Sequence, residues 1–186
     1  MMSQNPDSHL RRPPESELRQ RWDTVEENQL RIDPDDAAEI IDLLNRELSG
    51  LYILFNQLRK HYWTLEGAET GQVEATLQEN ADRVSELTDE LAIRAHALGG
   101  VPVNGPMGVR QHATLRIETG DVYDLRSALE NDLNAYATLA VQFREGVERA
   151  NELGDERTVE LLRSGLLALE RDAHAIERYL EDDSLA

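Results

Sequence analysis

Four long segments of the chain repeat apolar residues at spacings of three and four, and a connection over residues 101–120 separates the second segment from the third. Residues at these spacings share one face of an α-helix, so each segment predicts a helix with one apolar stripe. The expected helices span residues 33–67, 73–98, 121–153 and 155–180. Helices of this kind bury their stripes by packing side by side as a bundle.

The ends of the expected helices carry local signals of their own. Asp33 and Pro34 suit the start of the first helix, where acidic side chains interact favourably with the helix dipole. Gly99 and Gly100, followed by Pro102, indicate a firm end to the second helix. The predicted helix boundaries therefore rest on these acidic, proline and glycine residues as well as on the apolar period.

The connection over residues 101–120 is too long for a tight turn between neighbouring antiparallel helices. It must cross from one end of the bundle to the other, so the second and third helices run roughly parallel. The crossover also has room for one short helical turn. Four long helices with one central crossover are typical of a ferritin-like bundle, and the expected fold class is all-α.

The chain before the first expected helix is polar and lacks a sustained apolar period. We expect residues 1–34 to be a mobile polar tail, followed by one domain over residues 35–186. Arginines and acids are mixed in this tail, so it does not resemble a basic DNA-binding arm.

The composition excludes several kinds of site. The chain has no cysteine, so disulfides, thiolate metal sites and cysteine nucleophiles are absent, and any metal must bind oxygen and imidazole ligands. No segment approaches the roughly 20 apolar residues of a membrane span, and the first residues lack the apolar stretch of a signal peptide. These features predict a cytoplasmic protein without a membrane partner.

The formal charge is −18, from 37 acidic and 19 basic residues, and Lys60 is the only lysine. Dense carboxylates keep a protein surface solvated at high salt, where salt screens their mutual repulsion, so we expect a halophilic source. Proteins bind nucleic acids mainly through lysine and arginine side chains that neutralise the phosphates, and this binding weakens as salt rises. Direct DNA binding is therefore disfavoured.

Several stretches resemble the Dps family, and haloarchaeal members in particular: LYILFNQLRKHYWTLEGAE, DELAIRAHALGGVP, DVYDLRSALENDL and LLALERDAHAIERYLEDD. The resemblance covers residues 33–186. It implies a hollow shell of twelve identical subunits that oxidises iron at sites across a two-fold interface. In that family the ligands come from the end of the first helix and from the second helix of the neighbouring subunit.

Three of the four family ligand positions are substituted here. The family histidine that precedes the tryptophan is Tyr62, and His61 points about 100° away from that position on a helix. The second family histidine is Glu74, which still offers oxygen to iron. The family aspartate is retained as Asp89, but the glutamate four residues later is Ile93.

These substitutions leave open whether the chain is a ferroxidase. Tyr62, Glu66, Glu74, Asp89 and His61 are the candidate ligands of a remodelled iron site, because carboxylates and imidazoles are suitable iron ligands. The first hypothesis is a Dps-like shell that stores iron and protects against oxidative stress. The alternative is an inactive structural or regulatory cage that binds another ligand or co-assembles with an active Dps protein.

Overall fold

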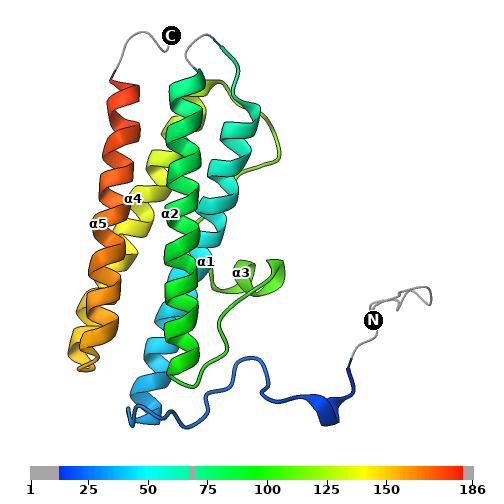
Figure 1. Cartoon of the computed structure of the whole chain (residues 1–186), viewed down its shortest axis with the longest axis vertical. Coiled ribbons are helices and arrows are strands. Elements are labelled where there is room, and N and C mark those ends of the chain that lie inside the picture. Colours follow the sequence, from blue (N-terminus) through cyan, green and yellow to red (C-terminus); the bar gives the residue numbers. More distant parts are fainter. Residues whose placement is uncertain (1–12, 68–69, 182–186) are drawn as a thin grey trace.

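The computed structural model describes residues 13–67 and 70–181, and the described residues form helices and connecting segments without a strand (Figure 1). The expected all-α, ferritin-like fold class is confirmed. The elements in chain order are η1 (Glu15–Glu17), α1 (Pro34–Thr64), α2 (Thr70–Ala97), α3 (Pro106–His112), α4 (Leu125–Glu152) and α5 (Glu156–Leu180).

The four long helices form two antiparallel hairpins, α1 with α2 and α4 with α5 (Figure 1). The crossover leaves the lower end of α2, includes the short helix α3, and rises to the upper end of the bundle where α4 begins. Consequently α2 and α4 run in the same direction, as the length of the connection predicts. None of the described helices has the length and apolar character needed to cross a membrane.

Capping residues set the helix boundaries within a few positions of the expected ones. The Asp33 carboxylate accepts a hydrogen bond from the Asp35 amide at 2.9 Å, so α1 begins at Pro34. The expected third helix starts four residues later than predicted, at Leu125, because Asp124 caps it by accepting from the Ser127 amide at 3.0 Å. Similarly, α1 ends at Thr64, before the glycine that the sequence suggested as its end.

The core consists of the predicted stripes, with small residues where helices approach closely. An added Cβ on Gly165 of α5 would lie 2.7 Å from the Phe143 ring of α4, so only glycine permits this contact. The largest wholly buried side chains belong to Tyr136, Phe143, Ile40, Leu44, Leu48, Leu51, Leu54, Leu58, Leu77, Leu91, Leu98 and Leu129.

The described part of the expected tail, residues 13–33, precedes α1 and includes the short helix η1. Residues 1–12 lie outside the described residues. The division into a mobile tail and a domain that begins at residue 35 stays a prediction.

Candidate functional site

The candidate metal ligands occupy two separate places on the α1–α2 hairpin. Tyr62 lies in the last turn of α1, Glu66 just beyond it, and Glu74 in the first turns of α2. Asp89 follows Glu74 by fifteen residues of the same helix, a separation of about 22 Å along the axis. One chain therefore does not bring Asp89 to the same ion as the other three residues.

The retained carboxylate, Asp89, is exposed on α2. Burial raises the pKa of Tyr52 on α1, and the negative charge of Asp89 raises it further. Ile93, one turn after Asp89, is 70% exposed. An apolar side chain thus stands on the surface at the position of the family glutamate.

Aromatic and cationic side chains surround Tyr62. The Trp63 ring lies edge-on to the Tyr62 ring, with centroids 5.9 Å apart, and is 62% exposed. The Arg59 guanidinium lies 4.5 Å from the centroid of the Trp63 ring, close enough for a cation–π interaction. Across residues 13–67 and 70–181, no three His, Asp or Glu side chains form a group that could hold a metal ion.

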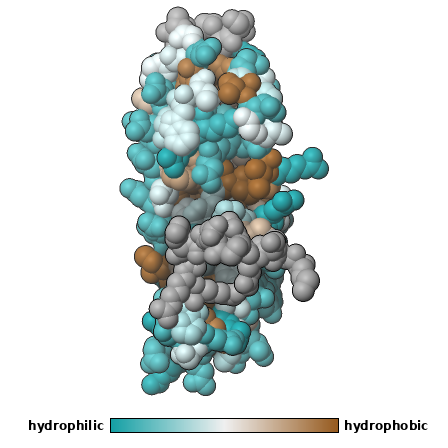
Figure 2. All heavy atoms as spheres, turned by 90° about the vertical axis from the view of Figure 1, so that its right-hand side faces the viewer, coloured by the Kyte–Doolittle hydropathy of each residue, from teal (hydrophilic) through white to brown (hydrophobic). Residues whose placement is uncertain are grey.

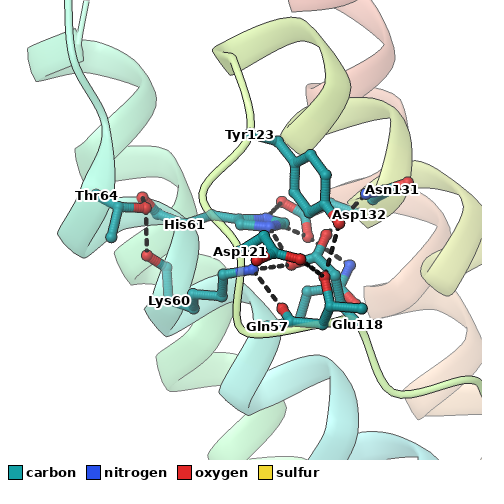
Figure 3. A network of polar contacts seen from close by, with 10 residues as sticks. Gln57, Lys60, His61, Thr64, Glu118, Asp121, Tyr123, Asn131 and Asp132 are labelled. Atoms are coloured by element: carbon teal, nitrogen blue, oxygen red, sulfur yellow. Dashed lines mark hydrogen bonds and ion pairs between the residues drawn. The ribbon is translucent and has the colours of Figure 1, made fainter.

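His61, the fifth candidate, lies inside the bundle and is 2% exposed (Figure 3). Its Nδ1 lies 2.9 Å from both carboxylate oxygens of Asp132, on α4. Its Nε2 lies 2.9 Å from a carboxylate oxygen of Glu118, in the crossover. Gln57, one turn earlier on α1, donates to Asp132 at 2.9 Å. Both ring nitrogens of His61 therefore already have partners within the chain.

Glu118 extends this network to the surface. Lys60 Nζ donates to Glu118 at 2.6 Å and to the Thr119 carbonyl at 2.8 Å, while Asn131 donates to the other Glu118 oxygen at 2.7 Å (Figure 3). The residues Gln57, Lys60, His61, Glu118, Asn131 and Asp132, called the His61 network below, join α1, the crossover and α4. The network thus fixes the last turns of α1, which carry Tyr62.

The charges of the His61 network compensate one another. Burial alone would lower the pKa of His61, but the hydrogen bonds and negative charges of Asp132 and Glu118 outweigh it and raise this pKa above its usual value. Burial would raise the pKa of Glu118, but Lys60, Asn131 and His61 lower it overall. Burial also raises the pKa of Asp132, because it outweighs the contacts of this carboxyl group with His61 and Gln57. Lys60 and His61 are the basic partners of the two acidic side chains.

A second buried cluster joins α2 to α5. Arg83 donates to Asp172 at 2.9 Å and to the side-chain oxygen of Asn80 at 2.5 Å. Asp172 and Asn80 are almost wholly buried, and the charge of Asp172 contributes to raising the pKa of Tyr136, after burial. Here too a cationic side chain neutralises the interior carboxylate, so the cluster connects helices in the way that the His61 network does.

A model of the ferritin-like domain matches residues 41–186. The DNA protection during starvation protein of Halobacterium salinarum is 46% identical over 84% of this chain and 86% of that protein. This chain belongs to the Dps family. A nutrient stress-induced DNA-binding protein of Synechococcus is 32% identical over 90% of this chain and 96% of that protein.

Solved Dps structures agree with the described fold. The crystal structure of an archaeal Dps homologue from Halobacterium salinarum superposes with a TM-score of 0.87 and 44% identity, over 91% of this chain and 95% of that one. DpsC from Streptomyces coelicolor superposes with a TM-score of 0.86 and 28% identity, over 89% and 96% of the two chains. The family match therefore extends over almost the whole described bundle.

The sequence prediction missed the partners of His61 in this Dps-family chain. The sequence does contain a signal for Asp132, because this acidic residue interrupts the apolar stripe of α4 between Leu129 and Tyr136 at helical spacing. An acid at a core position needs a buried partner. Glu118 carries no such signal, since the crossover has no period that would tell which of its side chains turns inward.

Proposed function

We propose that this chain is the subunit of a homo-oligomeric Dps shell that takes up and stores iron and so limits oxidative damage. The observation that carries the proposal is the 46% identity to a DNA protection during starvation protein over most of both chains. By resemblance to the Dps family, we propose twelve subunits and a cytoplasmic location.

Exposed apolar residues support assembly with other copies. Figure 2 shows the face that carries the crossover, where apolar patches interrupt a mostly hydrophilic surface. In the crossover, Met107, Ile117 and Val122 are between 62% and 79% exposed. Contiguous apolar patches on a monomer surface are characteristic of interfaces.

The positions of the candidate ligands support an iron site shared by two chains. Tyr62, Glu66 and Glu74 of one chain would meet Asp89 of another, since Asp89 is about 22 Å along α2 from Glu74. Phenolate and carboxylate oxygens are suitable iron ligands. His61 would join this set only by giving up its contact with Asp132 or Glu118.

A second candidate function is a cage without ferroxidase activity, with a structural or regulatory role. Two observations favour it: Ile93 supplies no ligand at an exposed position, and Tyr62 replaces a histidine. Such a cage would bind another ligand or co-assemble with an active Dps protein. The two candidates differ in what the shell does with ferrous iron.

The first prediction concerns iron uptake by the purified shell. Supplied with ferrous iron and either oxygen or peroxide, the shell should retain iron through gel filtration and oxidise it faster than buffer does. Asp89→Asn should reduce the retained iron by at least about tenfold, because it removes the charged ligand that the family position keeps. Asp82→Asn, at another exposed acid of α2, is the control and should change little.

An oxidation rate equal to that of buffer, with no effect of Asp89→Asn, would rule out the iron-storage proposal and favour the inactive cage. The double variant Tyr62→His with Ile93→Glu then distinguishes two causes. A gain in rate shows that only the ligands were lost, whereas no gain shows that the interface itself has changed.

We also propose that the shell is adapted to high salt and does not bind DNA directly. The charge of −18 at this chain length opposes binding to phosphates, although the similar Synechococcus protein is named as DNA-binding.

The second prediction is that lowering the salt to about 0.1 M loosens the shell, because carboxylate repulsion is then less screened. Far-ultraviolet circular dichroism and native mass should both change, and constant values at low salt would contradict the adaptation.

A further inference from the structure

Residues 20–26 precede α1 in the chain but make specific contacts with the far end of α2. The Glu26 amide donates to the Gly99 carbonyl at 2.9 Å. The Gln20 side-chain amide donates to the same carbonyl at 2.9 Å and to the Thr24 carbonyl at 3.0 Å. One carbonyl at the end of α2 therefore receives two hydrogen bonds from this segment.

The close approach requires glycine at position 99. Gly99 has φ +93°, and an added Cβ would lie 2.1 Å from the Glu26 carbonyl oxygen. The same turn ends α2, because the Gly100 amide donates to the Ala95 carbonyl at 3.0 Å. Gly99 thus ends the helix and at the same time accommodates the N-terminal segment.

Trp22 extends these contacts to α3. Its ring atoms lie 3.7 and 3.8 Å from the position that a Cβ on Gly108 would take, and its ring meets the His112 ring edge-on at a centroid distance of 5.7 Å. The helix α3 has seven residues and none of them is buried. A helix this short has little stability of its own, so the Trp22 contact contributes substantially to its position.

A second anchor lies just before α1. The Asn28 side chain donates to the Ile32 carbonyl at 3.0 Å and accepts from the Ile32 amide at 3.1 Å. Ile32 itself packs against the buried core. The segment is therefore attached at both ends, at the α2–α3 corner and at the start of α1.

We propose that residues 20–32 form a clamp whose docking surface is made by Gly99, Gly108 and His112, and which holds α3 against the bundle. The clamp goes beyond the proposed iron function and is an alternative to the mobile tail that composition predicts for this part of the chain. It also affects a neighbouring pocket of about 470 Å³, because Val109 of α3 lines that pocket together with Lys60 and Glu118 of the His61 network.

The third prediction tests the clamp in the assembled protein. In a Trp63→Phe background, Trp22 is the only tryptophan, so its fluorescence reports docking. Gly99→Ala should shift the emission to longer wavelength and speed trypsin cleavage after Arg21 and Arg31 by at least about tenfold. Gly154→Ala is the matched control, since Gly154 follows α4 at φ +73° with no atom near its added Cβ.

A second variant keeps the test decisive if Gly99→Ala fails to fold. Trp22→Ala removes only side-chain atoms and should speed amide hydrogen exchange in α3 while exchange in α2 and α4 stays slow. The proposal is overturned if the unaltered protein is cleaved after Arg21 and Arg31 as fast as a free peptide of residues 13–33. It is equally overturned if Trp22→Ala leaves exchange in α3 unchanged.

Discussion

Replacing Glu47 by glutamine should stabilise the folded chain by about 3 kcal/mol at pH 8. Glu47 lies wholly buried on α1, and burial raises its pKa from 4.5 to about 7, although Arg46 donates to one of its oxygens at 2.9 Å. Each pKa unit corresponds to about 1.4 kcal/mol between the folded and unfolded states. Glutamine keeps the shape of the side chain and removes the buried charge.

The effect of Glu47→Gln should depend on pH in a defined direction. Below a pH of about 4.5 the carboxyl is protonated in both states, so the variant gains nothing there. Between that pH and about 7 only the unfolded state ionises, so the unaltered protein loses stability as pH rises, and the loss is complete above pH 7. Denaturant unfolding at several pH values should show this widening difference between the two proteins.

Glu148→Gln, at an exposed acid of α4, is the control for the Glu47 prediction and should give a small difference at every pH. An equal gain from Glu47→Gln at pH 4 and pH 8 would show that shape, and not the ionisation of Glu47, explains the stabilisation.

Replacing Asp132 by alanine should destabilise the chain by about 3–5 kcal/mol. Asp132 is wholly buried and accepts from Gln57 and from Nδ1 of His61, so its loss leaves the Gln57 amide and this ring nitrogen inside the bundle without their acceptor. Removing one partner of a buried ion pair has costs of this size, because the remaining charge is uncompensated. The loss should persist at high salt, since salt screens buried pairs weakly.

The control for Asp132→Ala is Asp121→Ala, because Asp121 lies near the His61 network but is exposed (Figure 3). It should change the free energy of unfolding by less than about 0.5 kcal/mol. A loss below about 1 kcal/mol for Asp132→Ala would mean that His61 is neutral in the folded chain, or that solvent replaces its partner.

The helical period accounted for most of the fold. A stripe such as Leu44, Leu48 and Leu51 specifies which face of α1 is buried, whatever the partner helix is. Helix ends were less predictable because capping depends on a single side chain. At the start of α4, Asp124 and not Asp121 accepts a hydrogen bond from a backbone amide of the first turn. Nothing in the local composition distinguishes these two acids.

The candidate site was predictable as a set of positions but not as a geometry. Family resemblance identified Tyr62, Glu74 and Asp89, and the helical rise then showed that one chain cannot unite them. His61 was singled out by its neighbours in the sequence. Its environment depends on Asp132 and Glu118, which are distant in the chain and meet it only in the folded bundle.

By itself the sequence determined the four helices and the direction of the crossover, because these depend on local spacing and residue type. The substituted ligand positions come from the resemblance to the Dps family. Only the tertiary structure decided what Glu118, Trp22 and Gly99 do, since the connections that carry them have no period to orient a side chain. It also decided that His61 turns inward to Asp132, because long-range packing selects among the orientations that a helix end permits.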